Sequence, residues 1–121
     1  MATIIVYRPI GPTYGASVTA SSTAAANVPL DNQEIMAFAM FLNTGAVAVA
    51  VNIQAVNNTT GSGTAAAAVF PVSGTPQPGT FVLPAAMQSP MVISVPSGFS
   101  YTMIGAAAGP SAVYITPVGI Q

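Results

Sequence analysis

Few residues in this chain could carry out chemistry. Among its 121 residues there is no histidine, cysteine or tryptophan, and the only charged side chains are Arg8, Asp31 and Glu34. No imidazole is available as a base near neutral pH, no thiolate can act as a nucleophile, and no ligand set exists for zinc. Asp31 and Glu34 belong to one short polar stretch and have no further acid to assist them. We therefore expect no enzymatic activity.

The stretch from Asp31 to Glu34 is the most polar part of the chain. It is typical of a turn that leads into the apolar residues that follow, with Asp31 accepting backbone N–H bonds. Calcium would need more oxygen ligands than these carboxylates supply, so we expect no metal and no cofactor. Arg8 could pair with either carboxylate, within the subunit or across an interface, where a desolvated pair could fix the register.

The charge content also limits the partners. With one basic residue and a net charge of −1, the chain lacks the several Lys or Arg that a phosphate backbone requires, so we expect no nucleic acid. Only 2% of the residues are charged, against about 25% in an average soluble domain. Such a surface has little repulsion to keep it dispersed. We expect much of it to be buried against other protein subunits, including a trimer or another homo-oligomer.

The mean hydropathy of +0.68 raises the question of a membrane protein. The longest uncharged apolar window, Ile35 to Val56, is interrupted by polar residues, has no flanking Lys or Arg, and alternates with a period of two. The first residues lack a basic start followed by a long apolar run, and they do not resemble a signal peptide. We therefore expect no membrane span.

Proline and glycine, eleven of each, divide the chain into short segments of about 5–10 residues, the length of strands. The clearest strand is Ala46 to Gln54, in which valines and an isoleucine alternate with small or polar residues. The preceding run, Ile35 to Leu42, is apolar on both faces, which predicts a central strand. Asn43-Thr44-Gly45 between the two runs predicts a tight hairpin loop with a positive φ at Gly45.

The last third of the chain predicts a three-stranded meander. Its strands are Met91 to Val95, Phe99 to Ile104, and Ala112 to Thr116, which ends at Pro117. Weaker strand candidates are Thr3–Tyr7, Ser17–Ala20, Ala66–Pro71 and Thr80–Leu83, and Ser73 to Gly79 should be a surface loop. About eight short strands without intervening helices predict an all-β fold, an antiparallel β-sandwich of the Ig-like or jelly-roll-like type.

Residues 29–121 form one predicted β-sandwich domain, whereas residues 1–28 are poor in convincing strands. This first segment is either an extended N-terminal arm that lies over a neighbour or an edge strand with a loose loop. Tyr7, Arg8 and Tyr14 within it are candidate interface residues, because Tyr and Arg are enriched at interface hot spots. Met87 and Met91 flank Pro90 and either fill gaps in the core or belong to a contact surface.

Three stretches carry a family resemblance. They are Phe41-Leu42-Asn43-Thr44-Gly45 before alternating Ala and Val, Val95-Pro96-Ser97-Gly98 before an aromatic strand, and Val113-Tyr114-Ile115-Thr116-Pro117-Val118-Gly119 near the end. Over Pro29 to Gly119 the chain resembles the small decoration, or cement, proteins of tailed-bacteriophage heads, which are charge-poor β-sandwich proteins. The resemblance implies a virion protein on the capsid surface, made in the host cytoplasm, that binds over junctions between subunits of the major capsid protein. The alternative is another phage structural component: a tail, fibre-base or minor capsid protein.

Overall fold

The computed structural model describes residues 7–23, 38–54, 67–95 and 99–120. Within these ranges the chain forms eight β-strands and no helix, which confirms the all-β prediction. The strands are β1 (Tyr7–Pro9), β2 (Tyr14–Val18), β3 (Phe38–Asn43), β4 (Val49–Gln54), β5 (Thr80–Leu83), β6 (Met91–Ser94), β7 (Ser100–Gly105) and β8 (Ser111–Ile120).

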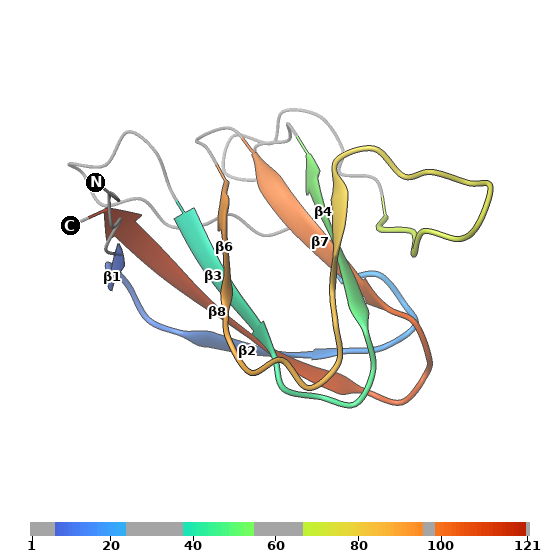
Figure 1. The fold of residues 1–121 in the computed structure, drawn as a ribbon, viewed down its shortest axis with the longest axis horizontal. Coiled ribbons are helices and arrows are strands. Elements are labelled where there is room, and N and C mark those ends of the chain that lie inside the picture. Colours follow the sequence, from blue (N-terminus) through green and yellow to red (C-terminus); the bar gives the residue numbers. More distant parts are fainter. Residues whose placement is uncertain (1–6, 24–37, 55–66, 96–98, 121) are drawn as a thin grey trace, which may run out of the picture.

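The strands form two antiparallel sheets that pack together around one core (Figure 1). The large sheet has the order β1-β8-β3-β6, with β2 also paired to β8, and the small sheet has the order β5-β4-β7. Every pairing between these strands is antiparallel. The predicted antiparallel β-sandwich is therefore confirmed.

The strand pairings are nested along the chain. β4 pairs with β5, β3 pairs with β6, and β2 pairs with β8. Residues 19–23 run antiparallel beside β7, because the Gly105 N–H donates to the Thr19 carbonyl at 2.7 Å and the Thr23 N–H donates to the Met103 carbonyl at 2.8 Å. A single long hairpin folded over into two sheets in this way is a jelly roll. The topology thus decides between the two sandwich types that the sequence left open.

The connection after β3 crosses from the large sheet to the small sheet. The predicted hairpin between residues 35–42 and 46–54 is therefore wrong, since β3 and β4 lie in different sheets. Gly45 also has no positive φ. It lies where the crossing chain touches the start of β8, and a Cβ added there would lie 2.7 Å from the Ser111 Cα. Close approach of two backbones, rather than a turn conformation, explains this glycine.

The predicted meander is wrong in the same way. Its three strands exist as β6, β7 and β8, but successive strands alternate between the two sheets. β8 also continues through Pro117 to Ile120. On one side of β8 the pairing is interrupted between β1 and β2, where the Ile10 N–H donates to the Pro117 carbonyl at 2.9 Å. The missing N–H of Pro117 is tolerated beside this break, as prolines within sheets generally require.

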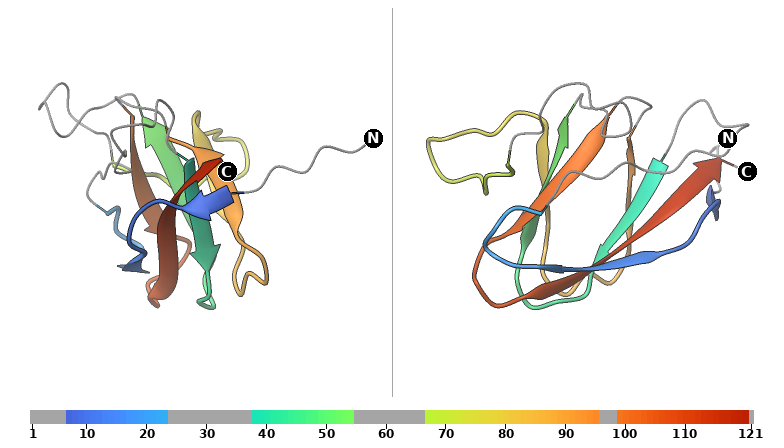
Figure 2. Two further views of the ribbon diagram at one scale, coloured as in Figure 1. Left: turned by 90° about the vertical axis from the view of Figure 1, so that its left-hand side faces the viewer. Right: turned by 180° about the vertical axis from the view of Figure 1, so that it is seen from behind.

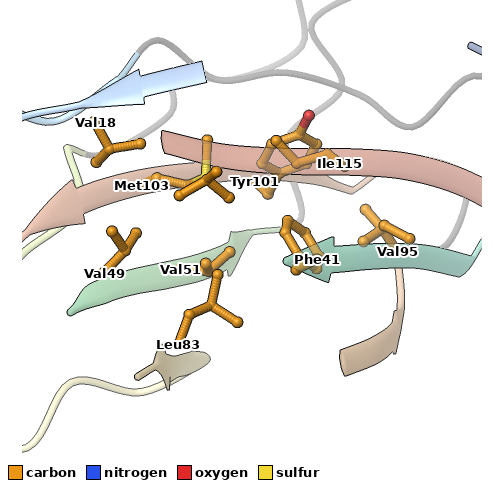
Figure 3. Close-up of a cluster of buried hydrophobic side chains, with 11 residues drawn as sticks. Val18, Phe41, Val49, Val51, Leu83, Val95, Tyr101, Met103 and Ile115 are labelled. Atoms are coloured by element: carbon orange, nitrogen blue, oxygen red, sulfur yellow. The ribbon is translucent and has the colours of Figure 1, made fainter. Parts of the chain in front are cut away.

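The core lies between the two sheets (Figure 3). Phe41 meets the edges of two other rings, Tyr101 at 5.6 Å and Phe81 at 5.8 Å between ring centroids, a geometry that stabilises aromatic pairs beyond their burial. Alternation within residues 46–54 places Val49 and Val51 in the core, as predicted. Other buried members of the core are Val18, Ala39, Leu83, Val95, Met103, Val113 and Ile115.

Residues 7–23 belong to the sandwich. β1 and β2 both pair with β8, and Val18 at the end of β2 is fully buried in the core. Of the two interpretations of residues 1–28, the edge strand is what the structure contains at 7–9 and 14–18. Residues 1–6 and 24–28 lie outside the described ranges.

Candidate contact surfaces

The side of the large sheet that points away from the core carries mostly apolar side chains. β3 turns Ala39 and Phe41 into the core, so Phe38, Met40 and Leu42 point to the opposite side, because side chains alternate along a strand. Their cross-strand partners share that side: the apolar Val92 of β6 and Tyr114 of β8, with the polar Ser94 and Thr116 and the fully buried Val118 beside them. The Tyr7 ring lies 5.7 Å from the Phe38 ring. We call these six residues the outer face: Tyr7, Phe38, Met40, Leu42, Val92 and Tyr114.

None of the six side chains of the outer face is charged, and most of them are partly buried by their neighbours. Five of them are half-buried, and Tyr114 is 43% exposed. The Tyr114 ring lies across Gly15 of β2, where an added Cβ would lie 3.4 Å from a ring carbon. Such an aromatic cover stabilises a glycine in a strand. The prediction that β3 is a central strand with two apolar faces is confirmed, and its second face points away from the core.

The structure does not gather the predicted interface residues on one surface. Tyr7 belongs to the outer face, and Arg8 is exposed on β1. Tyr14 is half exposed, but it is the cross-strand partner of Ile115 and therefore lies on the core side of the sheet. There its proximity adds to the effect of burial in raising the pKa of Tyr101.

Met87 and Met91 pack against the core from the β5–β6 side of the sandwich. The Met87 sulfur accepts a hydrogen bond from the Asn43 N–H at 3.3 Å, and the Met87 N–H donates to the Asn43 carbonyl at 2.8 Å. These contacts favour the gap-filling role of the two open interpretations.

Asn43 is a buried polar hub at one end of the sandwich. Its side-chain amide donates to the Val47 carbonyl at 2.8 Å and to the Pro84 carbonyl at 3.2 Å. Its Oδ1 accepts from the Gly45 N–H at 3.1 Å and from the Ser111 hydroxyl at 2.7 Å. One side chain thereby joins the connections between β3 and β4, β5 and β6, and β7 and β8. Fully satisfied buried networks of this kind fix one arrangement of the chain.

The side of the small sheet that points away from the core contains polar atoms that lack hydrogen-bond partners. Ser100 and Thr102 are 1% and 2% exposed, and their hydroxyl oxygens, like Asn52 Oδ1, have no hydrogen-bond partner. Asn52 and Thr102 lie directly across from each other on β4 and β7. No base that could activate a hydroxyl lies among the described residues, since Arg8 is the only charged side chain within 7–23, 38–54, 67–95 and 99–120.

Residues 69–77, which we call the proline loop, project from the sandwich at the end of its longest axis that is opposite β1 and the end of β8 (Figure 1; Figure 2, right). Val69 is 52% exposed and Val72 63%. A tight turn closes the tip, where the Thr75 N–H donates to the Val72 carbonyl at 3.0 Å and Gly74 takes a φ of 80°. Pro71 and Pro76 flank this turn and restrict its backbone.

Both ends of the proline loop are tied to the sandwich. Before the loop, the Ala68 N–H donates to the Ser22 hydroxyl at 2.8 Å. After it, the Asn52 amide donates to the Pro78 carbonyl at 3.1 Å and the Ile53 N–H donates to the Gly79 carbonyl at 2.9 Å. The prediction of a surface loop at 73–79 is confirmed, and the weak strand candidate at Ala66–Pro71 is wrong over residues 67–71.

Sequence reasoning found part of each surface, the two apolar faces of residues 35–42 and the loop at 73–79, but not their neighbours in the fold. The two-sided apolar pattern of residues 35–42 was visible, but placing Val92 and Tyr114 beside it required the register of β6 and β8 with β3. The signal for the proline loop was a pair of valines beside closely spaced prolines. That pattern does not reveal exposure until the fold places the loop outside the sandwich.

No group of three or more metal-binding side chains exists among the described residues, and Asp31 and Glu34 lie outside them. The described part of the chain also contains no helix long and apolar enough to cross a bilayer. Comparison of the chain with protein-family models, curated protein sequences and solved structures finds no match.

Proposed function

We propose that the chain is a structural virion protein, which binds over junctions between major capsid subunits and stabilises the phage head. The observation that carries the proposal is the almost complete lack of charge on a chain with apolar side chains on the outer face, where Tyr114 is exposed, and on the proline loop, where Val69 and Val72 are exposed. Contacts between such surfaces depend on apolar burial, which is the main favourable term in protein association.

The jelly-roll topology supports the same reading at the level of fold. Jelly rolls occur in viral capsid proteins, and also in lectins and cupins, so the topology alone does not assign a function. Cupins commonly hold metals through histidine and carboxylate side chains, and this chain has no histidine and only Asp31 and Glu34 as acids. A structural role is compatible with the composition because packing requires no ionisable group.

A contact without charges should hold to a capsid shell over a wide range of salt concentrations. Screening by salt weakens attraction between exposed charges but leaves apolar contacts intact. Repetition on a symmetric lattice makes overall attachment strong even where each contact is weak. A decoration protein of this kind would stay attached when the ionic strength around the particle changes.

The copy number per particle tests this proposal. Quantitative mass spectrometry of virions purified from the phage that encodes the chain should find it in numbers comparable with the major capsid protein. A few copies per particle would instead assign it to a tail, a fibre base or a minor capsid position. Absence from purified virions would contradict both.

A further inference from the structure

We propose that Tyr114 and the hydroxyl groups around it form a binding site for a neutral pyranose sugar on the solvent side of the large sheet. The sugar stacks on the Tyr114 ring and exchanges hydrogen bonds with serine and threonine hydroxyls at neighbouring strand positions. The inference goes beyond the proposed function and does not rest on it. Tyr114 lies on β8 and Val92 on β6, with β3 between them, so a sugar at Tyr114 leaves the β6 side of the outer face available to the shell.

The Tyr114 ring is supported from one side and still accessible to a ligand. A Cβ added at Gly15 would lie 3.4 Å from the ring Cε1 and 3.6 Å from the ring Cδ1, so the ring rests against the backbone of β2. The side chain is nevertheless 43% exposed. Ala112, two residues before it on β8, is small and exposed. A ring that is ordered before binding loses little conformational entropy when a ligand stacks on it.

Hydroxyl groups lie on both sides of the ring along the strands. Side chains two residues apart share one side of a sheet and lie about 7 Å apart, which places Thr116 next to Tyr114. The Thr116 hydroxyl lies 2.7 Å from the Thr13 hydroxyl, with which it shares a hydrogen bond. In the other direction along β8, the cross-strand partner of Ala112 is the exposed Ser17. A pyranose centred on the Tyr114 ring therefore has protein hydroxyls within reach at both ends.

This arrangement matches the chemistry of a neutral sugar. One face of a pyranose presents C–H groups with partial positive charge, which are attracted to the electron-rich face of an aromatic ring. Sugar hydroxyls donate and accept hydrogen bonds, as those of Ser and Thr do. The one charged side chain in the described part of the chain, Arg8, pairs with Gly119 near the far end of β8. A sugar acid would lose hydration at Tyr114 without gaining an opposite charge, so the site favours neutral sugars.

Saturation-transfer NMR on the isolated chain tests the site. The probes are the methyl glycosides of glucose, galactose, mannose and N-acetylglucosamine, with that of glucuronic acid as the charged comparison. Tyr114→Ala removes the ring, Tyr114→Phe keeps the ring over Gly15, and Thr116→Val removes a neighbouring hydroxyl. Tyr14→Ala is the matched control, because Tyr14 is 49% exposed on the opposite side of the same sheet. Circular dichroism melts establish that each variant is folded.

We expect at least one neutral glycoside to bind with a Kd of about 1–10 mM, as one stacked ring with few hydrogen bonds allows. Saturation of the protein's aromatic protons should pass most strongly to the C–H protons of one sugar face. Affinity should fall by about 10-fold or more in Tyr114→Ala through loss of the stacked ring. It should fall by about 3-fold or more in Thr116→Val through loss of a hydrogen bond. Tyr114→Phe and Tyr14→Ala should bind nearly as the wild type does.

Three results would each overturn the inference: no neutral glycoside binds, the glucuronic acid glycoside binds as tightly as the neutral ones, or a folded Tyr114→Ala binds like the wild type. If Tyr114→Ala does not fold, Thr116→Val decides, and undiminished binding by that variant overturns the site. The copy number of the chain in virions is measured independently, so the proposed function stands or falls separately.

Discussion

Glycine is required at position 45 by the close approach of two backbones, and the sequence alone does not reveal this reason. Its φ is not positive, yet a Cβ there would collide with the Ser111 side chain and lie 2.8 Å from the Ala112 nitrogen. We expect Gly45→Ala to lower the free energy of unfolding by about 1–3 kcal/mol, the usual range for overpacking. Chemical denaturation followed by circular dichroism measures the change.

Gly109 supplies the matched control for that substitution. A Cβ added at Gly109 would meet nothing within 4 Å, and its φ is not positive. Gly109→Ala should leave stability unchanged or raise it by up to about 1 kcal/mol through the unfolded chain. Equal losses in the two variants would contradict the close approach of the backbones at Gly45.

The buried hydroxyl of Thr102 should lower the stability of the fold. It is 2% exposed and has no hydrogen-bond partner, so folding removes it from water without compensation. Thr102→Val keeps the side-chain shape and the β-branching, and it should raise the free energy of unfolding by about 1 kcal/mol or more. A loss of stability in the thermal or chemical melt would mean that the hydroxyl is hydrogen-bonded in solution.

Tyr101 sets the response to alkaline pH. Burial, with a smaller contribution from Tyr14, raises the pKa of its phenol above the ordinary value of 10.0. Below pH 10 the phenol is neutral in both the folded and the unfolded chain. As the pH rises above 10, the unfolded chain ionises first, so stability falls until the folded phenol ionises as well.

Tyr101→Phe removes that ionisation while keeping the ring against Phe41. We expect the wild type to lose more stability than the variant as the pH rises above about 10, where the unfolded phenol ionises before the folded one. Urea melts at several pH values measure the difference. Parallel pH profiles for the two proteins would rule out Tyr101 as the group responsible.

At the scale of elements, the strands were predictable and their partners were not. Alternation of large and small residues marked 46–54 and 99–104 because that pattern is set by one strand facing one core. Which strands pair depends on contacts far apart in sequence, such as β2 with β8. Nearest-neighbour reasoning therefore joined β3 to β4 and β6 to β7, where the jelly roll sends each connection across to the other sheet.

The sequence also did not reveal which polar residues are buried and hydrogen-bonded between the strands. Asn43 resembled a turn residue in the sequence, because asparagine next to glycine-containing stretches commonly forms turns. In the fold it is the last residue of β3 and is fully buried, with partners near residues 47, 84 and 111. A residue satisfied by three separate connections has no local sequence signal.

The edge formed by β1 and β2 is an element whose removal should unfold the protein. Deleting residues 1–18 would remove Val18 from the core and leave one edge of β8, beside the core residues Val113 and Ile115, without its partner strand. An N-terminal arm that only contacts a neighbour could be deleted without this effect. Loss of the cooperative melt in the truncated chain is expected, and a folded truncated chain would return the arm interpretation for this segment.

At the scale of the whole molecule, the composition restricted function more than any motif did. The scarcity of charge pointed to apolar contact with other subunits, while the two surfaces that could make it became visible only in the fold. Of the five residues proposed from sequence as interface residues, Tyr7 lies on the outer face, and Met87 and Met91 pack against the core.

Co-sedimentation with capsids that lack the protein measures whether the chain binds the shell through apolar contacts of its outer face. The wild type and the Val92→Asp variant would be mixed with such capsids at about 0.1 M and about 1 M salt, where the Debye length falls from about 10 Å to about 3 Å. We expect the wild type to sediment with capsids equally at both salt concentrations, and Val92→Asp, although folded, to sediment far less. Release of the wild type at high salt, or undiminished binding of Val92→Asp, would contradict apolar attachment through the outer face.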